Sequence, residues 1–422
     1  MSAVAVLGCG YVGLTTGACL AHFGHDVVCA DVEPGRISLL QGGELPFVEP
    51  DLAGLVSDSQ AAGRLRFVLG AAEAVADREF AVVCVPTPRG PGDAPDLTFV
   101  RRCVAEVAPA LSKAAIMIVK STVPVGTTAE VQRWLGRSDV AVVSNPEFLR
   151  EGSAVHDCLH PDRIVVGCDD RAAAHRVAQL YDGCAAPVVI TDPRTAEVLK
   201  YTANAFLATR LSFINAISTV CDVLGADMDG VVAGLGYDRR IGPEFLQPGP
   251  GWGGSCLPKD TRALLRMAGD AGLRFELLEQ VIETNDRQID SVIGKIRVAA
   301  GGTLRGAVVA VLGLAFKANT DDLRDSPAII IIERIVGEGA IVRAYDPTAR
   351  EAAGTYELAT TPYEAAESAD VVAVLTEWEE FRDLDLDKLA ALMRGNAVVD
   401  ARNMLDKAAF VAAGYDYTGL GR

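Results

Sequence analysis

The segment GWGGSCLPKD, residues 251–260, places one cysteine between a run of glycines and a Pro-Lys-Asp that is typical of a helix start. Glycines allow a backbone to approach a ligand closely. Pro258 suits the first position of a helix, so we expect Cys256 near a helix N-terminus, where the dipole and Lys259 favour a thiolate. Asp260 follows four residues later and would face back toward Cys256. This pattern predicts a reactive thiol; the alternative is a glycine-rich surface loop with an inert cysteine.

Lys200 and Asn204 are a second pair of candidates, four residues apart in a segment that predicts one long helix. The segment begins at Asp192, a favoured helix cap, and reaches Gly225 with no proline after Pro193 and no internal glycine. Such a helix would be about 50 Å long, so we expect it to bridge two domains and to be a candidate subunit interface. Its expected apolar stripe comprises Val198, Phe206, Leu207, Leu211, Ile214, Ile217 and Leu224.

The two polar residues interrupt this stripe on one face, and two interpretations are open. Lys200 could extend to solvent beside an Asn204 amide that is simply satisfied. Both could instead point into a cleft, where desolvation tunes the lysine for acid-base work.

The beginning of the chain predicts a dinucleotide site. A β-branched segment is followed by Gly8, Gly10 and Gly13, a helical pattern up to Gly24 and a second strand that ends at Asp31. In this βαβ context the three glycines permit a tight turn, close approach of a pyrophosphate and close helix packing. Asp31 would bind the ribose hydroxyls and repel a 2′-phosphate, which favours NAD over NADP. The alternative is a glycine turn that binds no ligand.

Three further strands are expected in the first third of the chain, each with polar residues at its end. The segment AVVCV precedes Pro-Thr-Pro with Thr87, AIMIVKST ends at Thr122, and VAVVSNPEF ends near Glu147. Ligands bind beyond the carboxyl ends of parallel strands, so Thr87, Ser121, Thr122 and Glu147 are site candidates. Ordinary turn chemistry is the alternative for each of them.

Length, charge and cysteine content limit the class of protein. At about 150 residues per domain, 422 residues predict two or three domains, which we place at 1–191, 192–300 and 301–422. A net charge of −17 argues against a nucleic-acid surface. The sequence has no run of about eighteen apolar residues, which a membrane-spanning helix would need. The first residues of the chain lack the basic n-region of a secretory signal. Ten cysteines without metal-ligand spacing predict reduced thiols, no metal site and a cytoplasmic location.

The last third repeats the α/β pattern without the glycine fingerprint. From residue 306 a strand, a loop, a helix capped by Ser326 and a strand up to Asp346 follow one another, with two more strands afterwards. The expected fold is therefore α/β, with two Rossmann-like parallel-sheet domains joined by a long central helix. Lys317, Arg324 and Arg402 at strand ends would suit phosphate or carboxylate recognition, or they are solvated surface charges.

The chain resembles the UDP-glucose/GDP-mannose dehydrogenase family of nucleotide-sugar dehydrogenases over its whole length. The resemblance is carried, in order, by GCGYVGL, KSTVPVGT, NPEFLREG, EVLKYTANAFLATRLSFIN, RIGPEFL, GWGGSCLPKD, LAFKANTDDLRDSP, DARN and YTGLGR. It implies two Rossmann-like domains, a dimer formed through the long helix, and oxidation of a sugar C6 alcohol to the acid with two NAD. UDP-glucose, giving UDP-glucuronate, is the first expected substrate, because RIG followed by Phe-Leu favours it.

The resemblance also implies a role for each candidate in the reaction. Cys256 would form a thiohemiacetal that becomes a thioester, while Lys200 and Asn204 stabilise the oxyanion. Asp260 would serve in proton transfer with Lys200. Thr122 and Glu147 would position or activate the hydrolytic water. Arg240 would reach the site from the neighbouring subunit of a homodimer.

Binding segments follow from the same matches. The expected NAD residues are Gly8, Gly10, Tyr11, Val12, Gly13, Asp31, Arg36, Thr87, Thr122, Glu151, Lys259 and Arg324. The expected residues for the UDP-sugar are Glu147, Phe148, Leu149, Arg150, Glu151, Lys200, Asn204, Arg240, Phe245, Leu246, Gln247, Pro248, Gly249, Gly253, Lys317 and Arg402. The chain departs from the family at Trp252, where Phe or Tyr is usual, and at Gln247-Pro248, which replaces a small or basic pair.

Other functions remain open at this point. GDP-mannose 6-dehydrogenase, or a dehydrogenase of another nucleotide sugar, would share this machinery. A simple β-hydroxyacid dehydrogenase would need neither Cys256 nor a second α/β domain. A non-catalytic nucleotide-sugar binder would not need Cys256, Lys200, Asn204 and Asp260 together.

Overall fold

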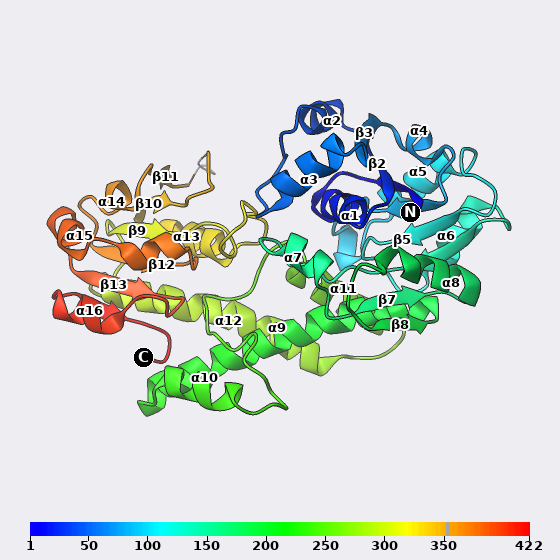
Figure 1. The fold of residues 1–422 in the computed structure, drawn as a ribbon. Helices are drawn as coiled ribbons and strands as arrows, with labels where there is room; N and C mark the ends of the chain where they lie inside the picture. The colour runs from blue at the N-terminus through cyan, green and yellow to red at the C-terminus, as the bar shows by residue number, and fades with distance from the viewer. Residues whose placement is uncertain (352–354) are drawn as a thin grey trace. The chain divides into compact units, whose positions relative to one another are not determined.

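The computed structural model describes residues 1–351 and 355–422, which form two compact units, Met1–Ala203 and Asn204–Arg422 (Figure 1). The point of division lies inside the longest helix, α9 (Pro193–Leu224). The division of the chain into residues 1–191, 192–300 and 301–422 stays a prediction.

The first unit is a doubly wound sheet with the strand order β3-β2-β1-β4-β5-β6-β7-β8. Its strands are β1 (Ala3–Leu7), β2 (Asp26–Asp31), β3 (Leu65–Leu69), β4 (Phe80–Val83), β5 (Ile116–Val119), β6 (Ala141–Ser144), β7 (Ile164–Gly167) and β8 (Val188–Thr191). The first six run parallel, and β7 joins β6 through an antiparallel pairing. The order reverses direction at β1 and β4, the place where such sheets bind ligands.

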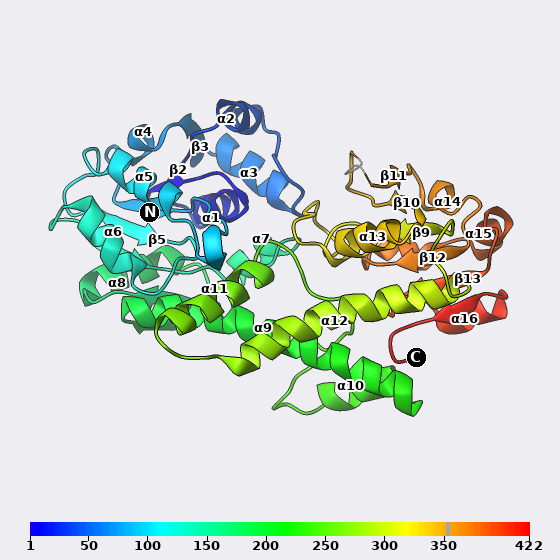
Figure 2. The same cartoon turned by 180° about the vertical axis from the view of Figure 1, so that it is seen from behind.

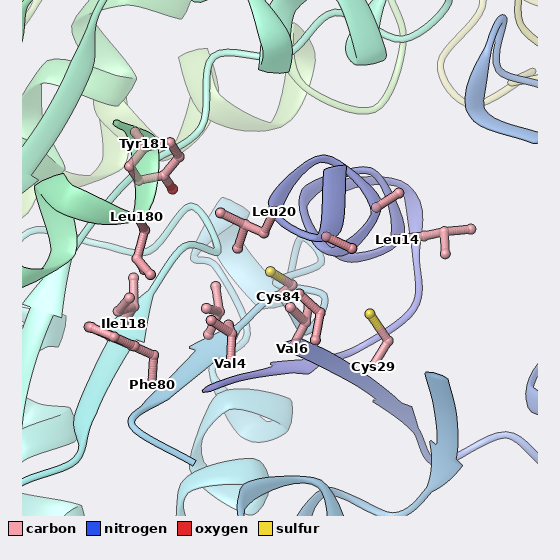
Figure 3. Packing of buried hydrophobic residues seen from close by; sticks show 14 of the residues in the cluster. Val4, Val6, Leu14, Leu20, Cys29, Phe80, Cys84, Ile118, Leu180 and Tyr181 are labelled. Atoms are coloured by element: carbon pink, nitrogen blue, oxygen red, sulfur yellow. The ribbon is translucent and has the colours of Figure 1, made fainter. Parts of the chain in front are cut away.

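Helices cover both faces of this sheet. They are α1 (Tyr11–His22), α2 (Pro34–Gln41), α3 (Leu52–Ala61), α4 (Ala71–Val75), α5 (Thr98–Val107), α6 (Thr127–Leu135), α7 (Ala154–Leu159) and α8 (Arg171–Ala178). Because side chains alternate along a strand, Val4 and Val6 face Leu14 and Leu20 of α1 (Figure 3), while Leu7 lies in the core on the other face with α4, α5 and α6. Both faces are apolar, as expected for a buried parallel sheet.

Strands β5 and β6 are shorter than predicted. β5 ends at Val119 and β6 at Ser144, so Thr122 and Glu147 lie three residues beyond the strand ends. Directly after the two strands, the Lys120 ammonium donates to Asn145 Oδ1 and to the Tyr181 hydroxyl, both at 3.2 Å. The polar site candidates therefore lie in loops anchored by a buried polar cluster.

Helix α9 begins where predicted, because Asp192 accepts hydrogen bonds from the backbone and hydroxyl of Thr195. Its predicted apolar stripe is wrong in part. Ile214 is fully buried, whereas Phe206 is 62% and Leu224 74% exposed. Helix α9 has one apolar face that is buried and another that is exposed. The residues predicted to form a single stripe are divided between these two faces. Among the described residues, α9 is the one helix long and apolar enough to cross a membrane, a test that core helices also pass.

In the second unit, three helices follow α9 and precede a second sheet. The helices are α10 (Met228–Gly236), α11 (Leu257–Asp270) and α12 (Glu276–Ala299). The sheet, all parallel, has the order β11-β10-β9-β12-β13-β14, formed by β11 (Glu357–Leu358), β10 (Ile341–Tyr345), β9 (Val308–Leu312), β12 (Val371–Val374), β13 (Ala397–Asp400) and β14 (Asp416–Thr418). This strand order matches that of β3-β2-β1-β4-β5-β6 in the first unit, which confirms the predicted second Rossmann-like domain.

The second sheet is also covered on both faces. Helix α13 (Pro327–Gly337) and the apolar side of α12 pack on one face, as Figure 2 shows from behind. Helices α14 (Pro362–Ala365), α15 (Leu386–Leu392) and α16 (Lys407–Ala412) cover the other. Ser326 caps α13 as predicted, since its hydroxyl accepts from the Ala328 N–H. Helix α12 therefore belongs to the core of this unit through Ile289, Val292 and Ile296.

Glu197 fixes the first turns of α9 within the first unit. Its buried carboxylate accepts from the Gly126 N–H at 2.5 Å and from the Thr128 N–H and hydroxyl at 2.7 and 2.6 Å. It thereby satisfies donors at the N-terminus of α6, which has no side-chain cap of its own. Burial raises the pKa of Glu197, and the donors of Thr128 and Gly126 oppose that rise.

We expect Glu197→Ala to lower the free energy of unfolding by about 2–5 kcal/mol, because it leaves buried donors without an acceptor. Urea unfolding followed by circular dichroism measures the change. Glu130→Ala is the control, since the Glu130 side chain is 43% exposed and pairs with Arg133 at 3.5 Å; it should cost about 1 kcal/mol or less. Equal losses in the two variants would contradict the capping role.

Candidate active site

The glycine turn after β1 has the geometry of a dinucleotide site. A Cβ on Gly8 would lie 2.8 Å from the Cys84 carbonyl oxygen, and one on Gly13 only 1.8 Å from that of Gly8. Gly8 also has φ +104°, which disfavours other residues. A Cβ on Gly10 would meet no protein atom within 4 Å. Gly8 and Gly13 are thus required by packing, whereas the open space at Gly10 and the N-terminus of α1 fit a pyrophosphate.

Asp31 ends β2 beside this turn and is already partly satisfied. Its Oδ2 accepts from the Cys9 N–H at 2.8 Å and from the Arg36 guanidinium at 2.9 Å, and Oδ1 accepts from the Glu33 N–H at 3.0 Å. The Asp31 carboxylate therefore has a fixed orientation. Arg36, which the sequence also assigns to NAD, pairs with Asp31 and with Glu33 at 3.1 Å.

The turn after β9 in the second unit has a backbone hydrogen bond like that of the turn after β1, but its side chains differ. Gly313 donates to the Tyr345 carbonyl at 2.7 Å, as Gly8 does to that of Ala30. Asp346 Oδ2 accepts from the Leu314 and Ala315 N–H groups and from the Trp378 indole. Ala315 stands where the first turn has Gly10, so a methyl group occupies the position that is open there.

Thr87 and Thr122 are brought together at the carboxyl ends of β4 and β5. The Thr87 hydroxyl donates to the Thr122 carbonyl at 2.8 Å, and the neighbouring Ser121 hydroxyl donates to the Val85 carbonyl at 2.6 Å. Thr87 is buried and Thr122 half-buried. These bonds hold the two loops in register beside the switch point of the sheet.

Glu147 and Lys200 form a buried ion pair. The Lys200 ammonium donates to Glu147 Oε1 at 3.0 Å, while Oε2 accepts from the Leu149 N–H at 2.6 Å. Burial works to raise the pKa of Glu147, but the Lys200 charge and the Leu149 N–H outweigh it, so that this pKa is lowered. The Phe148 ring lies between cations, with Lys200 5.4 Å and Arg163 3.7 Å from its centroid. Glu147 is therefore an ionised carboxylate in an apolar setting.

The segment after Glu147 is held from several sides. Arg150 pairs with Asp157 at 2.7 Å. Buried Glu49 accepts from the Gly152 and Ala154 N–H groups at 2.7 and 2.6 Å. The two remaining predicted residues of the segment, Leu149 and Glu151, are half-buried.

In the second unit, Asn204, Asp260 and Lys259 form a connected group. The Asn204 amide donates to Asp260 Oδ2 at 2.6 Å, and Lys259 pairs with Oδ1 at 2.5 Å. Asp260 is 1% exposed. The predicted side chains at 204, 259 and 260 therefore act as one network, in which Lys259 is a partner of Asp260.

Cys256 lies at the N-cap of α11, as the glycine and proline pattern predicted. The helix begins at Leu257, one residue earlier than expected, so Pro258 is its second residue. The Asp260 N–H donates to the Cys256 carbonyl at 2.9 Å, which confirms that the two residues lie one turn apart. Cys256 is half-buried, and its sulfur lies 3.5 Å from the Ser255 hydroxyl. Of the ten cysteines, eight are buried, Cys184 is the other half-buried one, and all are free thiols.

The predicted nucleotide-sugar residues of the second unit are gathered in part. Arg402 donates to the Leu375 and Phe316 carbonyls at 2.9 Å and pairs with Glu377 at 3.0 Å. A Cβ on Gly249 would lie 3.1 Å from the Arg402 guanidinium, so Gly249 makes room for it. Lys317 lies 5.5 Å from the Phe316 ring centroid.

Other predicted binding residues lie apart from these contacts. Arg324 pairs with Asp322 at 2.7 Å and Arg240 with Asp238 at 2.6 Å, and both arginines are exposed. Within the preceding loop, Leu246 and Pro248 are buried, Phe245 is half-buried with φ +57°, and Gln247 is exposed.

The sequence analysis missed four buried polar residues that hold the loop before Cys256. These are Ser212, Asn215, Asn285 and Gln288. A signal for them exists, because each is a polar residue on an otherwise apolar helix face, as Lys200 and Asn204 are. The signal was weaker for Asn285 and Gln288, which lie in no recognised motif, whereas Ser212 and Asn215 lie within EVLKYTANAFLATRLSFIN.

Three family models cover most of the chain. Residues 2–185 match the NAD binding domain, 194–287 the central domain and 310–407 the UDP binding domain of the UDP-glucose/GDP-mannose dehydrogenase family. The chain belongs to this family. It is therefore an oxidoreductase that uses NAD and takes a UDP-sugar.

Individual relatives agree over the full length. The UDP-glucose 6-dehydrogenase of Rhizobium meliloti (strain 1021) is 45% identical, with 99% of each chain covered. That of Bacillus subtilis (strain 168) is 42% identical, covering 100% of this chain and 94% of the relative. The structure of a UDP-glucose dehydrogenase from Pyrobaculum islandicum superimposes with a TM-score of 0.93 at 36% identity, covering 100% of this chain and 98% of the other.

The glycine turn gives a matched test of the cofactor site. We expect Gly13→Ala to destabilise the first unit by about 1–3 kcal/mol, because the new Cβ forces the backbone apart. Gly10→Ala meets no protein atom, so it should keep the unfolding midpoint and weaken NAD binding by about tenfold or more. Thermal unfolding and calorimetric titration with NAD measure the two effects. Unchanged NAD affinity in Gly10→Ala would mean that the phosphates do not approach this turn.

Proposed function

We propose that this enzyme oxidises UDP-glucose to UDP-glucuronate and that Cys256 is its nucleophile. The observation that carries the proposal is the half-buried Cys256 thiol at the N-terminus of α11, one turn before an Asp260 bonded to Asn204. The names of the full-length relatives support the choice of UDP-glucose.

The overall reaction converts a C6 alcohol and one water into a carboxylate, releasing two hydrides and three protons. Bound NAD, in the site formed by Gly8, Gly10, Gly13 and Asp31, supplies the hydride acceptor for each oxidation. Tyr11, Val12, Arg36, Thr87, Glu151, Lys259 and Arg324 remain proposed contributors to that site. An aldehyde gives up a second hydride only after a nucleophile has added to it, and this requirement defines the task of Cys256.

Cys256 adds as a thiolate to C6 of the aldehyde, so that a carbon–sulfur bond forms and the carbonyl oxygen becomes an oxyanion. Lys200 and Asn204 stabilise this oxyanion by charge and hydrogen bonding. Departure of the hydride leaves a thioester. A water molecule then cleaves the carbon–sulfur bond, which releases the acid and the thiolate.

Glu147 and Thr122 act on this hydrolytic water, and Asp260 moves protons together with Lys200. The lowered pKa of Glu147 keeps it ionised as a hydrogen-bond acceptor for water at neutral pH. Lys200 and Asn204 lie one turn apart on one continuous helix. This spacing supports a shared role in stabilising the oxyanion.

The residues proposed for UDP-sugar binding are Phe148, Leu149, Arg150, Glu151, Phe245, Leu246, Gln247, Pro248, Gly249, Gly253, Lys317 and Arg402. A panel of nucleotide sugars with NAD tests the substrate, and NADH formation with UDP-glucose should exceed that with GDP-mannose. No NADH with any sugar nucleotide would favour a non-catalytic binder. The free thiols support a reducing, cytoplasmic compartment.

A homodimer is the proposed assembly. Helix α9 exposes Phe206, Phe213 and Val220 at intervals of seven residues, with exposures of 62, 55 and 47%. A seven-residue spacing aligns them on one face, and such a face suits a second copy of the same helix. Arg240, whose side chain is 88% exposed, would then complete the site of the partner.

The first prediction of this mechanism concerns Cys256. Cys256→Ala should bind UDP-glucose and lose steady-state acid formation, with residual turnover stopping at the aldehyde. Cys256→Ser should form an ester that hydrolyses slowly, because an alkoxide leaves less readily than a thiolate. Intact-protein mass spectrometry should detect the added sugar nucleotide on the Ser variant. Acid formation by Cys256→Ala at the parent rate would overturn the role of the thiol.

A second prediction concerns Arg240. In a dimer mixed from equal amounts of inactive Arg240→Ala and Cys256→Ala chains, half the dimers are mixed and each has one intact site if Arg240 acts across the interface. About a quarter of the parent activity should return. The control is each variant alone. No recovery after subunit exchange, followed by mass spectrometry, would place both residues in the same chain's site.

A further inference from the structure

The glycine-rich loop before Cys256 is held by side-chain amides from two helices. At its start, the Gly249 N–H donates to Asn215 Oδ1 of α9 at 2.8 Å, and the Gly249 carbonyl accepts from the Gln288 amide of α12 at 2.8 Å. Both amide side chains are buried, at 2% and 4% exposure. Both backbone groups of this residue are therefore satisfied by side chains.

Trp252, four residues before Cys256, is also held through both of its backbone groups. Its N–H donates to Asn285 Oδ1 at 2.7 Å, and its carbonyl accepts from Asn285 Nδ2 at 3.0 Å. The side-chain amide thus replaces the partner that a neighbouring strand would provide. Asn285 is buried, so loss of either bond would leave an orphaned polar group.

The Trp252 indole adds a third anchor. It donates to the Ser212 hydroxyl at 2.9 Å, and that hydroxyl donates to the Val281 carbonyl at 2.8 Å. A phenylalanine or tyrosine at this position has no indole N–H to make this bond. The residue by which the chain departs from its family therefore has a specific partner in this structure.

On the opposite side, the loop packs closely against the backbone of Asp325 and the ring of Phe316. A Cβ on Gly253 would lie 2.0 Å from the Asp325 carbonyl oxygen, and one on Gly254 would lie 2.7 Å from the Phe316 ring. Side chains at these two positions are excluded, and the segment belongs to no helix or strand. From the α9 and α12 side, the Trp252 ring packs against apolar residues such as Ala205 and Leu278, and the polar contacts of Gly249 and Trp252 add directional bonds to that packing.

We propose that Asn285 and Trp252 are positioning residues for Cys256: they fix the loop so that the thiol stays at the N-terminus of α11. The proposal rests on the function proposed for Cys256. Neither residue is assigned a contact with substrate or NAD. Their effect is to keep the thiol within reach of C6, since small displacements of a reacting group cost much of its rate.

Hydrogen exchange followed by mass spectrometry tests the anchor directly. In Asn285→Ala, a peptide spanning residues 249–256 should exchange faster, while peptides from the two sheets should not change. Gln280→Ala is the matched control, because Gln280 is an exposed amide on the same helix and bonds to the exposed Glu283 at 2.9 Å. Unchanged exchange in the loop would overturn the proposal.

Kinetics test whether the anchor serves Cys256. For Asn285→Ala we expect kcat of acid formation to fall by up to about 100-fold, with KM for NAD changed by less than about threefold. Trp252→Phe, which keeps the ring and loses the indole bond, should show the same split to a smaller extent and covers the case in which Asn285→Ala does not fold. A parent-like kcat in a variant with a loosened loop would overturn the positioning role.

The Cys256→Ala enzyme distinguishes failure of this proposal from failure of the proposed function. If Cys256→Ala forms acid at the parent rate, the thiol is not the nucleophile and the positioning role in catalysis falls with it. If Cys256→Ala is inactive and Asn285→Ala has parent-like exchange and kcat, the nucleophile stands and the positioning role alone is refuted.

Discussion

The functional residues depend on the unbroken course of helix α9. Glu197, Lys200, Asn204 and Asn215 are spaced by three, four and eleven residues, so they share one face of the helix. All four are buried, with exposures of 3, 3, 7 and 2%. Each binds a different segment: the start of α6, Glu147, Asp260 and the loop at Gly249. One helix thus carries four attachments to segments that lie far apart in the sequence, two within the first unit and two within the second.

Burial makes these attachments specific. A buried amide or carboxylate gains about 0.5–1.5 kcal/mol from a satisfied hydrogen bond, but it costs about 1–3 kcal/mol when the partner is missing. Breaking the Lys200–Glu147 pair would leave an uncompensated charge, which is more costly still. The polar face of α9 therefore penalises alternative loop positions more than it stabilises the observed ones. Such a penalty is what a catalytic site needs, because its groups must stay within a fraction of an ångström of their working positions.

The sequence was most informative where function depends on neighbours along the chain. The glycine turn, Asp31, the Asp192 cap and the Cys256–Asp260 spacing are local patterns, and the structure has all of them. The partner of Lys200 could not be read locally, since Glu147 is 53 residues away. The apolar stripe of α9 failed for another reason. Ile214 and Phe206 are equally apolar, and hydrophobicity alone does not say which of two apolar faces a chain buries by itself.

The two sheets show how small a difference separates two binding surfaces on one framework. Both units have the same strand order, and in both the first glycine donates at 2.7 Å to the end of the neighbouring strand. In both, an aspartate at that strand end accepts from the N–H of the following residue at 2.8 Å. The difference lies two residues after the glycine. Gly10 leaves open space, whereas Ala315 adds a methyl group and donates its N–H to Asp346, which the Trp378 indole also binds. The first turn keeps the approach that a pyrophosphate needs, whereas the methyl group of Ala315 occupies the same position in the second turn.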